Sequence, residues 1–307
     1  MRIGVTGADG FVGRAVVRYL IERGLGDELK LVDRSFSDRS GPGERLAIDI
    51  TEPGAAPWIA DRLDCLIHLA ALPGAAAEAD PQASRRVNLD ATFALLEAMR
   101  GRRVVLASSI AVFGSGLPPE IGDSTLPSPD STYGVHKRAV ELVFADMVRQ
   151  GELTGMALRL PGIVARPAAA GEFGSSFLSE VFHAARNGSS LLLPVSSGAT
   201  TWLMSVRRCA ENLVYAALDE RSSAEAVTLP AVRARMCDLV EALAARGDAR
   251  HVSYRPDPAL ERVFGAWPPL TTARAEALGF RADDGLTELV AIALAELGET
   301  LDPCHPA

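Results

Sequence analysis

Apolar residues follow two different spacings along the first half of the chain. Short apolar runs alternate with stretches in which apolar side chains recur every three or four positions. The runs, which predict strands, lie at 3–6, 29–32, 65–69 and 104–107. The helical spacing covers 11–21, 84–99 and 133–148. Strands that alternate with helices and lack hairpin signals predict a parallel sheet covered on both faces.

The pattern changes near residue 160. Prolines, glycines and serines become frequent between 161 and 198, as in loops that carry binding specificity. Helices are predicted again at 206–218 and 235–246, and strands at 226–229 and 251–254. We therefore expect an α/β fold with two parts, a doubly wound parallel sheet over 1–160 and a smaller C-terminal α/β substrate-binding lobe over 161–307. The lobe is expected to be interleaved, returning one strand and one helix to the first domain.

Composition and charge narrow the class of protein. The 307 residues are 48% hydrophobic and 23% charged, which is ordinary for a globular protein with a large core. The net charge of −8 disfavours nucleic acid and anionic membranes as partners. The four cysteines lie far apart, which suits a reduced compartment. Glycine and proline interrupt the longest uncharged stretch, 187–206, and glycine breaks the segment 1–7. We therefore expect a cytoplasmic protein without a membrane span or signal peptide.

A glycine-rich turn follows the first predicted strand. Gly7, Gly10 and Gly13 have the spacing G-x-x-G-x-x-G, and a helix is predicted directly after it. Glycine lets the chain turn sharply and approach a pyrophosphate that binds at the helix N-terminus. Asp33 ends the second strand twenty positions after Gly13, the distance at which an acidic residue binds an adenosine ribose. These features predict a Rossmann-type sheet that binds a dinucleotide.

The identity of the dinucleotide depends on the charge near its adenosine ribose. The Asp33 carboxylate repels a 2′-phosphate and so favours NAD, although the neighbouring Arg34 has the charge that NADP prefers. Other residues are expected beside the cofactor because they belong to the turn or follow later strands. They are Asp9, Phe11, Val12, Asp49, Ile50, Leu69, Ala70, Ala71 and Pro161.

Tyr133 and Lys137 lie four residues apart, so on a helix both side chains project from one face. Only two of the 31 basic residues are lysines, which favours a chemical use for the Lys137 ammonium. An ordinary tyrosine pKa is about 10, and lowering it to neutral pH requires about 4 kcal/mol. A cation about 4–5 Å away, at an effective dielectric constant of about 20, supplies about that much. The pair therefore predicts a tyrosine that acts as general acid and base.

With the segment Ser-Ser-Ile-Ala-Val-Phe-Gly at 108–114, these motifs resemble the extended short-chain dehydrogenases/reductases of the NAD-dependent epimerase/dehydratase family. The resemblance covers nearly the whole chain. It implies that Tyr133 is the general acid and base and that Lys137 holds the nicotinamide ribose. It also implies that Ser109 hydrogen-bonds the reacting oxygen and that Asn88 supports the site. Ser109 is favoured over Ser108 by its offset from the Phe-Gly pair, but Ser108 stays open as the alternative.

The segments that bear on the substrate favour a sugar acid. The stretch 199–208 contains Trp202 and no acidic residue, unlike the Arg-Asp-Phe-like segment usual in nucleotide-sugar epimerases of the family. Ser109 lacks the following Asp-Glu pair of a dehydratase. Six segments, 87–92, 108–114, 158–164, 166–167, 202–205 and 254–258, resemble the D-erythronate dehydrogenase-like sugar-acid dehydrogenases, and the first two discriminate less than the last three. This resemblance implies NAD-dependent oxidation of a C2 hydroxyl to a 2-oxo acid.

A small hydroxy acid needs an anchor for its carboxylate. Arg166 and Ser175 are the candidates, with Arg207 and Ser176 as alternatives. Ser109 and Tyr133 are expected to contact the reacting hydroxyl, and Trp202 is expected at the substrate.

Two other functions stay open at this point: a nucleotide-sugar 4-epimerase, and a non-catalytic NAD-binding redox sensor. No group of His, Asp, Glu and Cys has metal-ligand spacing, so no metal is expected. The helix at 133–148 carries more apolar residues than one buried stripe needs, which predicts a homodimer.

Overall fold

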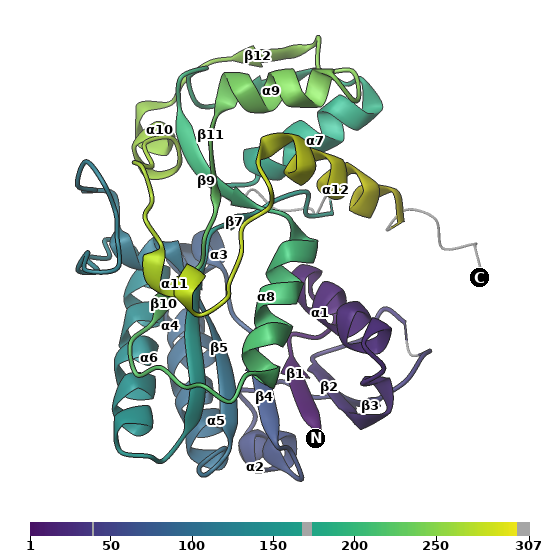
Figure 1. Ribbon diagram of the computed structural model, residues 1–307, viewed down its shortest axis with the longest axis vertical. Coiled ribbons are helices and arrows are strands. Elements are labelled where there is room, and N and C mark those ends of the chain that lie inside the picture. Colours follow the sequence, from purple (N-terminus) through teal and green to yellow (C-terminus); the bar gives the residue numbers. More distant parts are fainter. Residues whose placement is uncertain (39, 168–173, 300–307) are drawn as a thin grey trace. The chain divides into compact units, whose positions relative to one another are not determined.

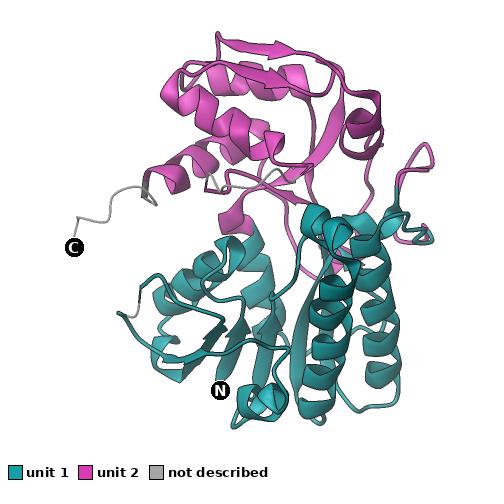
Figure 2. Cartoon of the chain, turned by 180° about the vertical axis from the view of Figure 1, so that it is seen from behind, with its two compact units in different colours: residues 1–114, 126–160, 209–228 teal, residues 115–125, 161–208, 229–307 magenta. Residues whose placement is uncertain are grey.

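The computed structural model describes residues 1–38, 40–167 and 174–299 (Figure 1). The chain forms two compact units (Figure 2). Unit 1 contains Met1–Gly114, Leu126–Leu160 and Cys209–Thr228, and unit 2 contains Ser115–Thr125, Pro161–Arg208 and the residues from Leu229 onward. The short segment Ser115–Thr125 therefore belongs with unit 2, whereas the sequence placed it in the first domain. No helix in the described part of the chain is long and apolar enough to cross a membrane.

Unit 1 is built on a seven-stranded parallel sheet with the order β10-β6-β5-β4-β1-β2-β3. The strands are β1 Ile3–Thr6, β2 Leu29–Asp33, β3 Glu44–Ala47, β4 Cys65–His68, β5 Arg103–Ser109, β6 Thr154–Leu160 and β10 Val227–Thr228. The order reverses at β1, and Ile3 lies between Leu29 and Cys65 in register. A doubly wound parallel sheet binds ligands outside the carboxyl ends of its strands at such a reversal. The predicted fold class is confirmed.

Helices cover both faces of this sheet, which is why its central strands read as continuous apolar runs. One face is covered by α2 Ala55–Ala60, α5 Thr92–Ala98 and α6 Thr132–Arg149. A buried cluster joins them to the sheet through side chains such as Ile59, Leu95, Phe144 and Val104. The other face is covered by α1 Phe11–Glu22 and α8 Val206–Leu218 (Figure 1).

The segment 84–99, predicted as one helix, is divided in the structure. Pro81–Arg85 forms α4, Arg86–Ala91 forms the π-helical turn η2, and α5 follows. The side chain of Asp80 accepts a hydrogen bond from the Ala83 amide at 2.9 Å and so fixes the start of α4 three residues earlier than expected. A π-helical turn inside a helix commonly marks a functional site, and here it holds Asn88.

Unit 2 contains two small sheets. Strands β7 Gly162–Ile163, β9 Thr200–Met204 and β11 Val232–Arg235 form one, in which β9 and β11 are antiparallel; β8 Leu191–Leu193 and β12 Val252–Tyr254 form the other. The described helices are α7 Phe177–Asn187, α9 Met236–Ala244, α10 Pro258–Phe264, α11 Ala273–Ala277 and α12 Leu286–Glu299. Buried apolar residues of β9, α7, α9 and α12, such as Leu203, Phe182, Leu239 and Leu289, form its core.

Candidate active site

The glycine-rich turn lies between β1 and α1, and two of its glycines leave no room for a Cβ. Gly7 has a φ of 70°, and its carbonyl accepts a hydrogen bond from the Gly10 amide at 3.1 Å. A Cβ on Gly13 would lie 2.0 Å from that same carbonyl oxygen, and a Cβ on Gly7 would lie 2.9 Å from the Ala70 nitrogen. Gly7 and Gly13 are therefore needed for a close approach of backbone to backbone, whereas a Cβ on Gly10 would lie 3.1 Å from the Gly7 carbonyl oxygen.

The N-terminus of α1 is suited to an anion. Gly10 is exposed and carries no side chain to cap the helix, and no acidic residue lies in the first turn. Phe11 and Val12 are half-buried at this end. The first amides of a helix have no partner within it, and the helix dipole favours negative charge there. The turn therefore fits the pyrophosphate of a dinucleotide.

Asp33, at the end of β2, is hydrogen-bonded to this turn. Its Oδ2 accepts from the Asp9 amide at 2.9 Å, and its Oδ1 accepts from the Arg34 amide at 2.8 Å. The carboxylate of Asp9 in turn accepts from the amide and the hydroxyl of Ser37, at 2.9 and 3.0 Å. Two carboxylates thus lie where the adenosine ribose would bind, which suits NAD better than NADP.

The segment of Asp49 and Ile50, which was expected beside the cofactor, lies next to Asp33. The Ile48 amide donates to the Asp33 carbonyl at 2.9 Å, so residues 48–50 run past the end of β2. The carboxylate of Asp49 accepts from the Thr51 amide and hydroxyl at 2.9 and 2.8 Å, and the hydrogen bond from this amide holds the pKa of Asp49 below its ordinary value. Ile50 is buried among the side chains under α2.

A buried histidine connects the turn to the neighbouring strand. The Thr6 hydroxyl accepts from the amides of Leu69 and Ala70, at 3.2 and 3.3 Å, so its proton is donated to Nδ1 of His68 at 2.7 Å. Nε2 of His68 therefore carries the ring proton and donates to the Thr92 hydroxyl at 3.0 Å. Burial, with a smaller effect of Lys137, lowers the pKa of His68 to about 3. His68 is thus a neutral structural residue that places Leu69, Ala70 and the half-buried Ala71 beside the turn.

Tyr133 and Lys137 lie together at the start of α6. The Lys137 Nζ is 5.6 Å from the centroid of the Tyr133 ring and donates to the Ala107 carbonyl at 2.8 Å. Lys137 is buried, whereas Tyr133 is half-buried. Burial lowers the pKa of Lys137 to about 8, and the Glu141 carboxylate opposes that effect. The amine therefore lies beside the phenol, and keeping it charged there costs folding free energy because the side chain is buried.

The two neighbouring serines of β5 have different environments. The Ser108 hydroxyl is buried and donates to Glu141 Oε1 at 2.6 Å. Ser109 is half-buried and follows on the opposite side of the strand, where its Oγ accepts from the Ala111 amide at 3.2 Å. The hydroxyl of Ser108 is thus committed to the interior, while Ser109 still has its hydroxyl proton to donate.

Asn88 is buried in the π-helical turn and uses its amide fully. Its Oδ1 accepts from the Leu72 amide at 2.8 Å, and its Nδ2 donates to the Leu72 carbonyl at 2.9 Å and to the Ser84 hydroxyl at 3.0 Å. The Ser84 Oγ also lies 2.8 Å from Nδ1 of His136 on α6. Asn88 therefore ties the chain after β4 to the helix that carries Tyr133.

In unit 2 the structure brings Arg166 and Ser175 together. Arg166 Nη2 donates to the Ser175 hydroxyl at 3.3 Å. The preceding residue, Ala165, has a φ of 61°, an uncommon conformation for a residue with a side chain. His183 of α7 donates through Nε2 to the Arg166 carbonyl at 2.6 Å. No motif in the sequence points to His183, because a lone histidine on an amphipathic helix has no distinctive spacing.

Two other predicted residues lie in interiors. Trp202 on β9 is fully buried within unit 2, where its Nε1 donates to the Pro268 carbonyl at 2.8 Å and its ring packs 4.6 Å from that of Trp267. Its indole has neither surface nor donor left for a substrate, which corrects the expectation placed on it. Pro161, predicted beside the cofactor, is buried directly after β6.

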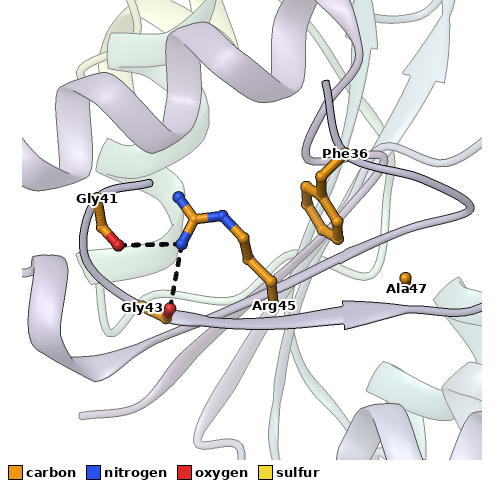
Figure 3. A pocket seen from close by; sticks show the side chains of 5 residues that line it. All are labelled: Phe36, Gly41, Gly43, Arg45 and Ala47. Carbon is orange, nitrogen blue, oxygen red and sulfur yellow. Dashed lines mark hydrogen bonds between the residues drawn. The ribbon is translucent and has the colours of Figure 1, made fainter. Parts of the chain in front are cut away.

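A hollow next to β3 is lined by Phe36, Gly41, Gly43, Arg45 and Ala47 (Figure 3). Arg45 reaches across it and donates to the carbonyls of Gly41 and Gly43 at 3.0 and 3.3 Å. The guanidinium therefore holds the loop between β2 and β3. Among the described residues, no group of three or more His, Cys, Asp or Glu side chains could hold a metal ion.

Comparison with protein families gives one match that covers most of the chain. Residues 3–227 match the model of the "NAD dependent epimerase/dehydratase family". Two curated relatives are named D-erythronate dehydrogenase. The one from Cupriavidus necator is 32% identical over 97% of this chain and 99% of its own length. The one from Haemophilus influenzae is 30% identical over 94% of this chain and 98% of its own length.

Solved structures share the architecture. A nucleoside-diphosphate-sugar epimerase from Agrobacterium tumefaciens has a TM-score of 0.87 and 29% identity, over 97% of this chain and 95% of that one. A GalE-like L-threonine dehydrogenase from Cupriavidus necator, in a holo form, has a TM-score of 0.85 and 23% identity, over 97% of this chain and 100% of that one. The second likeness bears on the fold alone.

Proposed function

The chain belongs to the NAD dependent epimerase/dehydratase family and is an NAD-dependent oxidoreductase, and from that premise we propose that it oxidises the C2 hydroxyl of a four-carbon sugar acid such as D-erythronate to a 2-oxo acid. The observation that carries the chemistry is the position of the Lys137 ammonium against the Tyr133 ring. The two D-erythronate dehydrogenases, which align over almost their whole length, support the choice of substrate class.

Each residue of the site has a distinct task in this reaction. Tyr133, as phenolate, accepts the proton of the substrate hydroxyl, and Ser109 donates a hydrogen bond to the same oxygen as it becomes a carbonyl. Lys137, whose ammonium donates to the Ala107 carbonyl, stabilises the phenolate through its charge and would hold the nicotinamide ribose. Asn88 holds the chain after β4 in place. Bound NAD supplies the acceptor for the hydride from the substrate carbon.

Arg166 and Ser175 are proposed to anchor the substrate carboxylate. A guanidinium and a hydroxyl 3.3 Å apart present converging donors, as carboxylate recognition requires. The left-handed backbone conformation of Ala165 sets the direction in which the Arg166 side chain projects. Arg207 and Ser176 are the alternatives for the same task.

A nucleotide-sugar 4-epimerase is the second candidate function, because the family model is named for epimerases and the Agrobacterium structure is named a nucleoside-diphosphate-sugar epimerase. It uses the same proton and hydride steps but returns the hydride to the sugar. A panel of D-erythronate, other tetronates, UDP-glucose and UDP-galactose with NAD separates the two. Accumulation of reduced cofactor with a tetronate supports the dehydrogenase, whereas interconversion of the two UDP-sugars without net reduction would support the epimerase. A non-catalytic redox sensor would do neither.

Assembly and location are part of the same proposal. Val135, Leu142 and Val143 lie along one side of α6, and each exposes more than a third of its surface. We infer that this stripe packs against a second copy in a homodimer, which light scattering would detect. The described cysteines are free thiols, in keeping with the cytoplasm.

A further inference from the structure

Glu141 is a buried carboxylate at the centre of an ion network in unit 1. It lies one helical turn beyond Lys137 on α6, and its side chain is 1% exposed. Arg159 of β6 binds it through two hydrogen bonds, Nε to Oε1 and Nη2 to Oε2, both at 2.9 Å. Arg138 adds a third at 3.0 Å, and the Ser108 hydroxyl of β5 a fourth at 2.6 Å. The carboxylate is thus fully satisfied, as a buried charge must be.

This network joins the elements that carry the predicted catalytic groups. The hydrogen bond from Ser108 fixes which side of β5 faces α6, and side chains alternate along a strand, so it also fixes the side on which Ser109 emerges. The Arg159 guanidinium lies 5.1 Å from the centre of the Phe113 ring, in the turn Ile110–Phe113 that follows Ser109. The end of β5 is therefore held on both sides of Ser109.

The same carboxylate is the negative charge that acts on Lys137. Around Lys137 the packed elements offer His68 from β4, which is neutral, the Ala107 carbonyl from β5, and Tyr133 and Glu141 from α6 itself. Arg138 and Arg159 reach this region through Glu141. Burial opposes the charge of Lys137 and Glu141 supports it.

We propose that Glu141 is a positioning residue of the active site: through Ser108 and Arg159 it fixes the end of β5 that presents Ser109, and through its charge it keeps the Lys137 ammonium protonated beside Tyr133. The roles of Ser109 and Tyr133 in this inference rest on the proposed function, but the effect of Glu141 on the protonation of Lys137 is measurable without any substrate. A carboxylate that only solvated the surface would need none of the contacts that Glu141 makes with Ser108, Arg138 and Arg159.

The chain offers an unusually clean test, because it has only two lysines, Lys30 and Lys137. Lysine labelled with ¹³C at Cε gives two resonances, and the one missing from Lys137→Arg belongs to Lys137. In the full-length wild-type protein the Lys137 signal is expected to titrate with a pKa of about 8. In Glu141→Gln the midpoint is expected to fall by about one pH unit or more, since a full charge is removed at short range.

Asp146→Asn is the matched control, because Asp146 is an exposed carboxylate on the same helix that contacts Arg149 and Gln150. It is expected to leave the midpoint where it is. If Glu141→Gln does not fold, because it leaves Arg159 unpaired, the double variant Glu141→Gln, Arg159→Gln removes both charges and is expected to lower the midpoint as well. An unmoved Lys137 midpoint in the folded variant would overturn the proposal.

Enzyme kinetics provide the second measurement. With whichever substrate the wild type oxidises, Glu141→Gln is expected to lower kcat more than tenfold and to change KM less than threefold. As the pH is raised, the variant is also expected to lose activity at a lower pH than the wild type, because its Lys137 ammonium loses its proton earlier. An unchanged kcat and pH profile would also contradict the inference. If no tetronate is oxidised by the wild type, the proposed function fails, while the lysine titration still decides the role of Glu141.

Discussion

The ammonium nitrogen of Lys137 lies 5.6 Å from the centre of the Tyr133 ring, one helical turn away, and is held there by the Ala107 carbonyl. The amine is buried, so its charge acts on the phenol through a medium of lower dielectric constant than water. Burial of this charge costs folding free energy, which the hydrogen bond to Ala107 offsets only in part. We therefore propose that the pair serves proton transfer.

Tyr133→Phe removes the group that accepts the proton and leaves the ring in place. Turnover is expected to fall about 10²–10⁴-fold, the usual contribution of a general base. Binding of NADH, followed by its fluorescence, is expected to stay within a few-fold of the wild type, since the glycine turn and Asp33 are unchanged. Turnover within about tenfold of the wild type would assign the base to another residue.

Lys137→Met is expected to be inactive but more stable than the wild type at pH 7. The pKa of the wild-type Lys137 amine is 10.5 in an ordinary environment and about 8 in the fold, a difference that corresponds to about 3 kcal/mol of stability. Because the variant also loses the hydrogen bond to Ala107, its expected gain in stability is about 2 kcal/mol. The folded wild type binds fewer protons than the unfolded chain between pH 8 and 10.5, so its stability rises over that range. Urea titrations should therefore show the advantage of the variant shrinking above pH 8; a constant difference would contradict the burial effect.

The two serines of β5 should respond differently to alanine. Ser109→Ala removes the donor to the developing carbonyl oxygen, so kcat is expected to fall about 10²–10³-fold with little loss of stability. Ser108→Ala leaves one contact of Glu141 unmade and is expected to cost about 1–2 kcal/mol of stability, with a smaller loss of kcat. Steady-state kinetics and thermal melts of both variants make the comparison. The reverse order of kcat losses would make Ser108 the catalytic serine.

His68 makes the fold sensitive to acid. Its pKa is 6.5 in an ordinary environment and about 3 in the fold, where burial disfavours the charged ring. The unfolded chain binds this proton between pH 6.5 and 3 and the folded chain does not, so stability is lost as the pH falls through that range. His68→Gln, whose amide can accept from Thr6 and donate to Thr92, is expected to lose stability less steeply, by up to about 1.4 kcal/mol per pH unit. Parallel curves of unfolding free energy against pH would rule this out.

Asp33→Asn tests the selection of cofactor. The Asn side chain keeps the oxygen that accepts from the Asp9 amide, gives up the acceptor for the Arg34 amide, and loses the charge that repels a 2′-phosphate. The ratio of NADH to NADPH affinity is expected to fall about tenfold or more, which corresponds to about 1.4 kcal/mol. Calorimetric titration with both nucleotides measures it, and an unchanged ratio would place selectivity elsewhere, with Asp9 as the next residue to test.

The sequence predicts most of the first sheet because central parallel strands are buried on both faces. Ile3–Thr6, Leu29–Asp33 and Cys65–His68 were all expected within a residue of their ends. Strand β3, Glu44–Ala47, is at the sheet edge and half polar, so no apolar run marks it. The π-helical turn around Asn88 was also unexpected, because its residues keep the spacing of an ordinary helix.

Within the candidate site, motifs single out residues by their type and spacing, whereas the surroundings of a residue are visible only in the structure. Tyr133 and Lys137 are recognisable from spacing on one helix. Glu141, on the same helix, reads as a solvated charge, and only the structure shows Arg159 and Ser108 closing around it. The expectation that Trp202 contacts the substrate was wrong because the sequence of its segment does not reveal whether an apolar residue faces a cleft or the core, and Trp202 is buried in the core.

The most direct test of the account follows a hydrogen atom. D-Erythronate labelled with deuterium at C2 is incubated with NAD and the wild-type protein, and the cofactor and the sugar acid are both analysed by mass spectrometry. We predict that the deuterium is recovered in reduced cofactor, that an equal amount of 2-oxo acid is formed, and that Tyr133→Phe forms almost none. Labelled substrate recovered intact from the wild type, with no reduced cofactor and with UDP-glucose and UDP-galactose interconverted instead, would contradict the assignment.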